Sequence, residues 1–354
     1  MLDRVASEGS EDATMFTTND VLFGKLRPYL AKVAVPTFGG CCSSEIIVLR
    51  PTVAVLRRFL YYCLLAEPFV RWINSFSYGT KMPRIDPERL MNARIPIPPI
   101  EMQAAIVRWL DEATRRVDGL LERNRRVRPL VLDHQNTRLA DLLKSAVGRR
   151  VRLKSVAKRI TSGSRGWAAY YDASGPAGFL RVGNLRRDWI DLKLDDLQRI
   201  SPPLGPEAVR SKTHCDDVLI SITANVGAVG VVPPGIGEVY VNQHVALLRL
   251  DTGACDSRYV ALALTAPEGQ QQLRSFLYGG TKEGLRLEDV LAVDVPLPPV
   301  SEQREVVEAA LRIRQTSELI LRKVSAADMQ LRQHRLSLIS GAVTGRINTN
   351  RGSV

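Results

Sequence analysis

The chain repeats itself at an offset of about 200 residues over most of its length. The phrase "ARIPIPPIEMQ" at residues 93–103 returns as "VDVPLPPVSEQ" at residues 293–303. Upstream, "NDVLFGKLRPYLAKVAV" at 19–35 matches "DDVLISITANVGAVGVV" at 216–232. Self-similarity on this scale means that the same structural unit is built more than once. The sequence therefore predicts two related domains.

Each copy begins with a stretch rich in Val, Ile, Leu and aromatic residues, broken by Gly, Pro, Asn and Asp, at residues 19–50 and 179–250. Such stretches are typical of short strands joined by turns. Residues 56–73 and 257–277 then carry apolar side chains at helical spacing. Each copy is therefore predicted to be a compact α/β (α+β) domain with at least one helix packed on its sheet.

A long helix is predicted after each proline-rich phrase, because apolar or small residues recur alternately every three and four positions. Two helices in one register favour a mutual coiled coil, although packing of each helix on its own domain stays open. Asn124 lies at a seam position, where an amide can fix the register. Pro129 lacks a backbone N–H and predicts a kink or break near Arg128. The residues expected to pack between the helices are Leu110, Ala113, Val117, Leu120, Asn124, Ala310, Ile313, Ile320, Val324, Leu331 and Leu338.

The two proline-rich phrases share the pattern Pro-x-Pro-Pro, from Pro96 and from Pro296. Proline fixes its own φ and biases the preceding residue towards an extended conformation. Each phrase is therefore expected to be a stiff extended connector that marks the boundary between a domain and its long helix.

The chain is basic, with 49 Lys and Arg against 37 Asp and Glu and a formal net charge of +12. This balance favours a polyanionic partner, nucleic acid first and an anionic membrane surface second, while a merely soluble surface is the alternative. No apolar run approaches the roughly 18 residues that span a bilayer, and the first 16 residues do not resemble a signal peptide. We expect a cytoplasmic protein that does not bind a membrane. The five cysteines lack the spacing of a zinc site or a disulfide framework.

Catalytic signatures are missing from the sequence. It contains no phosphate-binding loop, no dinucleotide loop, no HExxH and no [DNS]PP[YF] tetrapeptide. Asp216 and Asp217 suggest a metal-binding pair, but a turn that enters a strand explains them better. We therefore expect no catalytic residues, no metal site and no cofactor bound by this chain.

What remains is binding chemistry. The loops "SFSYGTK" at 75–81 and "SFLYGGTK" at 275–282 combine an aromatic ring, glycines, a hydroxyl and a cation, a set suited to phosphates and base edges. A glycine turn with solvated charges is the structural alternative. A second set occupies turn-like contexts beside Trp167 and Trp189, which are alternatively core residues. The candidate DNA-binding residues are Tyr78, Thr80, Lys81, Arg165, Arg181, Asn184, Arg186, Arg187, Tyr278, Thr281, Lys282 and Arg286.

With these residues in place, the chain resembles the specificity subunit of Type I restriction-modification systems. The resemblance rests on an ordered set: "LKSVAKRITSG", "DDVLIS", "YGGTKEGL", "VPLPPVSEQ", a long helix and "LISGAVTGRI". It implies two target recognition domains, each of which reads one half of a bipartite DNA sequence. It further implies that the two helices are antiparallel spacers. The expected divisions are 1–99 for the first recognition domain, 100–150 for the first spacer helix region, 151–299 for the second domain, 300–347 for the second helix region and 348–354 for a tail.

The resemblance also implies partners: double-stranded DNA, methyltransferase (modification) subunits and a restriction/translocase subunit. S-adenosylmethionine, ATP and Mg²⁺ are expected in those partner subunits. The chain would then be a non-catalytic subunit of a multi-subunit restriction endonuclease and adenine methyltransferase. Two alternatives stay open: a helical-rod protein-interaction scaffold without DNA binding, and a self-sufficient DNA methyltransferase or nuclease.

The first copy departs from this pattern. About 45 residues equivalent to 151–197 are absent before Asp20, so the first domain is expected to be N-terminally incomplete. A shortened reading frame, or a split or decayed gene, would explain the difference.

Overall fold

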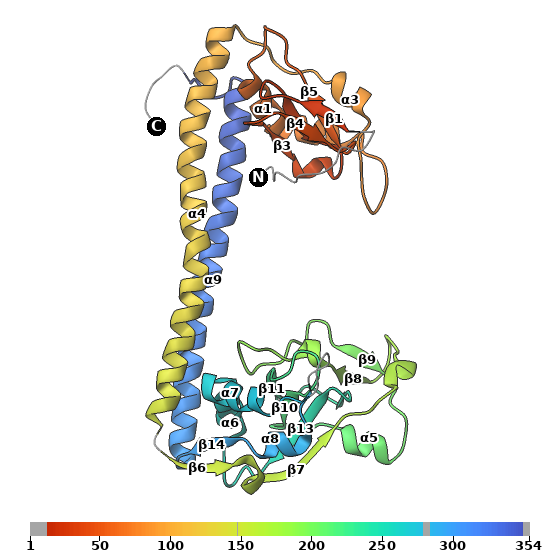
Figure 1. Cartoon of the computed structure of the whole chain (residues 1–354), viewed down its shortest axis with the longest axis vertical. Coiled ribbons are helices and arrows are strands. Elements are labelled where there is room, and N and C mark those ends of the chain that lie inside the picture. The colour runs from red at the N-terminus through yellow and green to blue at the C-terminus, as the bar shows by residue number, and fades with distance from the viewer. Residues whose placement is uncertain (1–12, 147, 279–283, 350–354) are drawn as a thin grey trace. The chain divides into compact units, whose positions relative to one another are not determined.

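The computed structural model describes residues 13–146, 148–278 and 284–349. The chain divides into two compact units (Figure 1). Unit 1 comprises residues up to Pro129 together with residues from Leu321 onward, and unit 2 comprises Leu130–Ile320. Two long helices, α4 (Ile100–Ser145) and α9 (Val300–Val343), each contribute to both units.

Unit 1 combines two small sheets with short helices. A three-stranded antiparallel sheet has the order β3-β2-β5, and β1 pairs with β4. The elements are β1 (Thr14–Phe16), β2 (Val21–Gly24), η1 (Pro28–Leu30), β3 (Val33–Ala34), β4 (Gly40–Cys42), β5 (Ile46–Leu49), α1 (Arg57–Leu65), α2 (Glu67–Asn74) and α3 (Pro87–Met91).

Unit 2 is larger and has three sheets. They have the orders β11-β10-β13-β7, β12-β8-β9 and β14-β6; among the described strands, β12 and β8 pair in parallel and the other pairs are antiparallel. The elements are β6 (Arg149–Arg152), η2 (Leu153–Ser155), β7 (Ala157–Ser162), η3 (Trp167–Tyr170), β8 (Ala177–Leu180), η4 (Val182–Asn184), β9 (Gln198–Ile200), α5 (Pro206–Ser211), β10 (Val218–Ser221), β11 (Val229–Val231), β12 (Val239–Val241), β13 (Val245–Leu250), α6 (Ser257–Thr265), α7 (Pro267–Ser275), α8 (Leu287–Leu291) and β14 (Asp294–Leu297).

The repeat in the sequence is a repeat in the sheets. Val21 pairs with Leu49 across β2 and β5, and Val218 pairs with Leu248 across β10 and β13 in the equivalent register. The central strands are buried because nearly all their residues are Val, Leu, Ile or Phe. Unit 2 places β6 to β9 and α5 ahead of this shared sheet, whereas in the described part of unit 1 only β1 precedes it.

A buried aspartate directly precedes the central strand of each unit. Asp217 is 1 % exposed and accepts two hydrogen bonds from Arg249, at 2.8 and 2.7 Å, and one from the backbone N–H of His214 at 2.7 Å. Asp20 is 3 % exposed and pairs with Arg50 at 3.6 Å. In both units the acid closes the turn before the strand and fixes it to the end of the neighbouring strand. The strand-entry turn predicted from the sequence is therefore the structure found.

The two long helices run antiparallel. Within unit 1, Arg335 Nε donates to Asp118 Oδ1 at 2.9 Å and Asn124 Nδ2 donates to Asp328 Oδ1 at 2.9 Å, so partners descend along α9 as they ascend along α4. Within unit 2, the last turns of α4 pack on the first turns of α9 in a shared apolar core. Asn124 makes the interhelical hydrogen bond expected of a seam amide.

The register of the seam differs from the predicted ladder at two positions. Leu120 is 44 % exposed and Ile320 is 40 % exposed. In a helix of 3.6 residues per turn, ten residues from Leu110 rotate a side chain about 80° away from the seam, whereas eleven rotate it only about 20°. Leu121 and Leu321 accordingly take the partly buried positions. Of the other predicted packing residues, Leu110, Ala113, Val117 and Ala310 are buried, and Asn124, Ile313, Val324, Leu331 and Leu338 are partly buried.

Of the kink or break predicted near Arg128, the break does not occur. Helix α4 continues through Pro129, although proline removes one backbone hydrogen bond and costs about 3 kcal/mol inside a helix. On the unit 1 side α4 contacts α9 directly before this proline, where Arg128 donates to Ser325 Oγ at 3.1 Å.

A buried glutamine clasps each proline-rich connector. Gln103 and Gln303 are both completely buried, and each Nε2 donates to the carbonyl of the second proline, at 2.8 and 2.7 Å. Each Oε1 accepts from the backbone N–H of the N-cap residue of a short helix of the same domain: Leu56 of α1 at 2.9 Å and Asp256 of α6 at 2.8 Å. The repeated phrase is therefore a three-way joint between the connector, the long helix and the domain.

Replacing Gln303 by leucine is expected to lower the free energy of unfolding by about 1 to 3 kcal/mol, because the substitution leaves a buried N–H and a buried carbonyl unpaired. Urea denaturation of the full chain measures this. Gln330→Leu, at an exposed position of α9, is the matched control and should unfold at the midpoint of the unsubstituted chain. Equal midpoints for the two variants would contradict the role of the clasp.

Candidate nucleic-acid interface

The first candidate loop is a hairpin in unit 1. Tyr78 and Arg84 exchange two backbone hydrogen bonds of 2.9 Å, and Gly79 turns the chain with φ of +90°. Tyr78 is 61 % exposed, and Thr80 and Lys81 are also exposed. The three predicted contact residues of this loop therefore project from one narrow hairpin, where a hydroxyl and an ammonium can reach phosphate oxygens.

The equivalent loop in unit 2 is described at its base. Tyr278 exchanges backbone hydrogen bonds of 3.2 and 3.1 Å with Gly284, and the guanidinium of Arg286 lies 5.0 Å from the centre of the Tyr278 ring. Thr281 and Lys282 lie outside the described residues. The structure thus brings two of the four predicted residues together, as a half-exposed ring held by a cation.

Asn184 does not fit the predicted role of a DNA contact. It is only 4 % exposed, and its side chain accepts from the N–H of Arg181 at 2.8 Å and donates to the carbonyl of Lys193 at 2.8 Å. An amide used in this way holds its own loop. The polar residue was assigned to DNA because the sequence does not reveal that the turn folds around it.

Two arginines of the same segment are also engaged internally. Arg186 pairs with Asp188 at 3.1 Å, and Arg187 donates to the side chain of Asn225 and the carbonyl of Val226, both at 2.5 Å. The Arg186 guanidinium braces its own loop, and the Arg187 guanidinium ties that loop to the turn at residues 225–226. Contact with DNA would compete with these bonds.

Helix α9 contributes to this network through Arg314, which is 8 % exposed, lies 3.7 Å from Asp188 and stacks over Trp189. Burial by itself would raise the pKa of Asp188, but the hydrogen bond from Arg186 and the charges of Arg186 and Arg314 bring it below its usual value. The network therefore ties the loop to the long helix as a set of charged pairs.

Arg165 and Arg181 are less engaged within unit 2 than the other members of the second set. Arg165 is exposed, and Arg181 makes one long ion pair of 3.8 Å with the fully exposed Asp196. Trp167 and Trp189 are each 2 % exposed, so both are core residues, as the structural alternative held.

A hollow of about 630 Å³ in unit 2 brings the predicted Arg181 together with polar side chains that the sequence did not indicate. Arg181, Lys193, Asn242 and His244 contribute to its lining. His244 Nε2 lies 3.0 Å from Gln243 Nε2, and its Nδ1 bonds to Thr223 Oγ1. Asn242, Gln243 and His244 immediately precede β13. Alignment of the two copies, which places His244 opposite Glu45, is the signal that would have found them.

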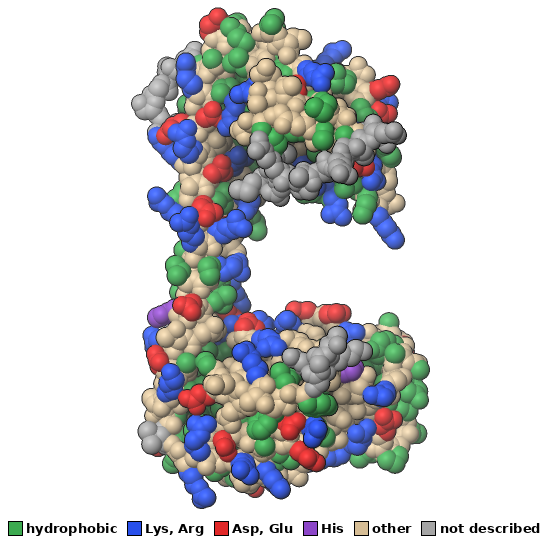
Figure 2. Space-filling model, viewed as in Figure 1, with side chains coloured by type: hydrophobic (Ala, Val, Ile, Leu, Met, Phe, Trp, Pro, Cys, Tyr) green, Lys and Arg blue, Asp and Glu red, His purple; other side chains and the backbone are tan. Residues whose placement is uncertain are grey.

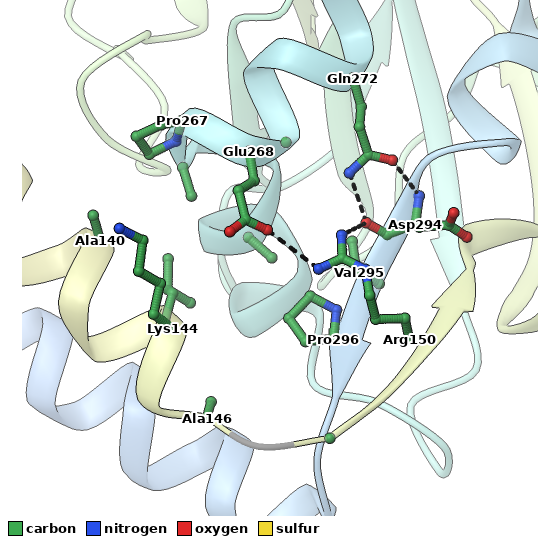
Figure 3. Close-up of a pocket in the computed structure, with 15 residues that line it drawn as sticks. Ala140, Lys144, Ala146, Arg150, Pro267, Glu268, Gln272, Asp294, Val295 and Pro296 are labelled. Atoms are coloured by element: carbon green, nitrogen blue, oxygen red, sulfur yellow. Dashed lines mark hydrogen bonds and ion pairs between the residues drawn. The ribbon is translucent and has the colours of Figure 1, made fainter.

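A second cavity of unit 2, about 340 Å³ in volume, lies between the end of α4 and the β6–β14 pair (Figure 3). Its polar groups bond to one another: Arg150 donates to Glu268 at 3.2 Å, and Gln272 bonds to both the N–H and the carbonyl of Asp294. Candidate DNA-binding residues do not line it. We therefore regard it as part of a structural joint.

Charge on the visible face of each unit is mixed, with Lys and Arg side chains interspersed among Asp and Glu (Figure 2). Recognition would therefore depend on particular side chains more than on one uniform basic surface. The described residues hold no cluster of three or more His, Cys, Asp or Glu suited to a metal ion. Helices within the described ranges are too short or too polar to cross a membrane.

Two units built on one framework, each presenting polar loops, define a protein with two duplicated domains. The family profile of the Type I restriction modification DNA specificity domain matches residues 6–126 and 211–323, so the chain belongs to that family. The match covers both copies of the repeat.

Three curated relatives from Escherichia coli are similar to this chain. The EcoDI specificity subunit of a Type I restriction enzyme is 31 % identical over 105 residues, which cover 30 % of this chain and 23 % of that subunit. The EcoBI specificity subunit is 22 % identical, and the match covers 82 % of this chain and 66 % of that subunit. The EcoKI specificity subunit, from strain K12, is 23 % identical and covers 88 % and 69 %. The chain thus spans less than a quarter of the first relative and about two thirds of the other two.

Two solved structures share the fold. A chain from a study of complex assembly and conformational transition in the type I R-M system has a TM-score of 0.78 at 21 % identity, and the match covers 96 % of this chain and 85 % of that one. The HsdS subunit from Thermoanaerobacter tengcongensis has a TM-score of 0.54 at 22 % identity, with 96 % and 84 % covered. The predicted fold class, repeated α/β recognition domains with two long antiparallel helices, is confirmed.

Proposed function

We propose that this chain is the sequence-specific DNA-binding subunit of a Type I restriction-modification complex, and that each unit reads one half of a bipartite target. The observation that carries the proposal is the duplication of one strand-and-hairpin framework with different polar side chains exposed in each copy. Two similar scaffolds with different surfaces suit two different half-sites, since sequence is read through side chains at base edges.

The remaining roles follow from this proposal. The antiparallel helices α4 and α9 act as the spacer and as the docking site for methyltransferase subunits, and a restriction/translocase subunit joins the same complex. This chain supplies no catalytic group and binds no cofactor; S-adenosylmethionine, ATP and Mg²⁺ belong to the partner subunits. The complex acts in the cytoplasm, and the domain divisions are those given by the repeat, at 99/100, 150/151 and 299/300.

The direct test is salt-dependent binding of the full chain to duplex DNA. We expect affinity to fall steeply as salt rises, because contacts to phosphates release counterions. The double variant Lys81→Glu/Arg165→Glu removes one exposed cation from each unit, so its affinity should be lower and its salt dependence shallower by about one unit of slope per lost contact.

Lys323→Glu, at an exposed position of α9, makes the same kind of charge change away from both candidate sites and should bind like the unsubstituted chain. Absence of DNA binding even at low salt would refute the proposal and favour a protein-interaction scaffold.

A further inference from the structure

Both units form the same junction of three backbone segments, at equivalent positions. The residue that directly follows the central strand donates its N–H to the backbone carbonyl of the residue directly before β5 or β13. Lys25 donates to Glu45 at 2.8 Å, and Ile222 donates to His244 at 3.0 Å. The segment after the hairpin donates back to Lys25 and Ile222, at 3.3 Å in unit 1 and 2.9 Å in unit 2. We call each of these sites the strand-exit junction, formed by residues 25–27, 44–45 and 78–85 in unit 1 and by the described parts of 222–224, 243–244 and 278–285 in unit 2.

The backbone of the junction is equivalent even where its conformation is unusual. Arg27 and Ala224 occupy the same place after the central strand, and their φ angles are +53° and +62°. This left-handed region is uncommon for residues other than glycine. Its occurrence in both copies shows that the framework is held in one shape while the side chains differ.

In unit 1 the junction presents an oriented guanidinium. Arg84 Nε donates to both carboxylate oxygens of Glu45 at 3.3 Å, and both side chains are about two-fifths exposed. Within the described residues, Glu45 is the only hydrogen-bond partner of this guanidinium. Both terminal nitrogens therefore remain as a forked pair of donors, which matches O6 and N7 of guanine in the major groove.

In unit 2 the backbone pair equivalent to Tyr78–Arg84 is Tyr278–Gly284, so glycine takes the place of the arginine. A Cβ at Gly284 would lie 3.5 Å from the Tyr278 hydroxyl, so the ring occupies the space that the arginine fills in unit 1. Beside it, the half-buried amide of Gln243 is held by His244. An amide nitrogen only donates, so His244 Nε2 accepts this bond and the ring proton on Nδ1 is donated to Thr223.

Among the described residues, His244 is the one hydrogen-bond partner of the Gln243 amide, and Nε2 uses one hydrogen on it, so the carbonyl oxygen and the second N–H are left for a ligand. One acceptor and one donor on a planar group match N6 and N7 of adenine. The two junctions thus offer a charged donor fork in one unit and a neutral donor–acceptor pair in the other.

We propose that the strand-exit junction is the base-reading position of each unit, where Arg84 recognises a guanine in one half-site and Gln243, positioned by His244, recognises an adenine in the other. This inference rests on the proposed DNA-binding function and adds the residues that determine specificity. Asp20 and Asp217 fix the opposite end of the same central strand in each unit, so side chains at the junction can differ on a common framework.

The test is selection of binding sequences from a random duplex pool by the full chain, by Arg84→Ala and by Gln243→Ala. Arg84→Ala should lose the preference for guanine at one position of one half-site, with about 5- to 150-fold less discrimination, and leave the other half-site unchanged. Gln243→Ala should abolish an adenine preference in the opposite half-site only.

Matched controls exist for both variants. Arg71 also pairs with a glutamate on the surface of unit 1, and Gln271 is an exposed glutamine of unit 2, so Arg71→Ala and Gln271→Ala should select the unsubstituted motif. A bipartite motif that Arg84→Ala and Gln243→Ala leave intact, or alter in the same half, would overturn this inference while the proposed function stands. Selection of no motif by the unsubstituted chain would overturn both.

Discussion

Alanine at position 217 is expected to destabilise unit 2 by about 3 to 5 kcal/mol, the range found when one partner of a buried ion pair is removed. Asp217 is 1 % exposed and accepts from both Arg249 and the turn that precedes it. Its hydrogen bond raises the pKa of Arg249, so this guanidinium stays charged and would lose its partner. The change would therefore remove a pair that joins β10 to β13.

Hydrogen exchange of the amides in β10 and β13 measures this local stability directly. Asp195→Ala, in an exposed turn of the same unit, is the control and should leave these amides protected. Protection in Asp217→Ala equal to that of the control would show that the buried pair does not hold the two strands together.

Phe59→Ala is the second change with a large expected effect, a loss of about 3 to 5 kcal/mol from unit 1. Phe59 is completely buried in a core shared with Leu110 of α4 and Ile339 of α9. Tyr62, one turn further along α1, lies in the same core, where burial raises its pKa to about 12. Removal of the ring would leave a cavity where α1 meets both long helices.

Urea denaturation of the full chain should show an earlier unfolding transition for Phe59→Ala. Val53→Ala, at a fully exposed position of the same unit, provides the comparison and should not move the transition. Coincident curves for the two variants would mean that this core contributes little to unit 1.

The repeat made the fold predictable, because the same periodicities occurred twice in one order. Strand-like and helical stretches, the proline-rich connectors and the long helices could all be found by aligning the chain with itself. The structure adds the side chains that fix the connectors, which the sequence did not identify. Gln103 and Gln303, conspicuous only as a repeated letter, prove to be the buried side chains that hold each connector in place.

Details of packing were less predictable. The heptad ladder misplaced Leu120 and Ile320 because a repeat of 3.5 residues drifts against a helix of 3.6 residues per turn. Of the kink or break expected at Pro129, the break does not occur, and a single stretch of sequence does not show the contacts that α4 makes with α9.

Candidate contacts were the hardest to predict. Asn184, Arg186 and Arg187 were chosen as polar residues in turns, and the structure uses them to hold those turns together. Arg84 and Gln243 were missed because they are not part of a motif. They are identified only when the hydrogen bonds of the two strand-exit junctions are compared position by position.

If two similar units read two different half-sites, the motif that the full, unsubstituted chain selects from random duplex DNA should reveal both. We expect two short blocks of different sequence, separated by a gap of constant length without base preference. One continuous block, or enrichment of no sequence at all, would contradict it.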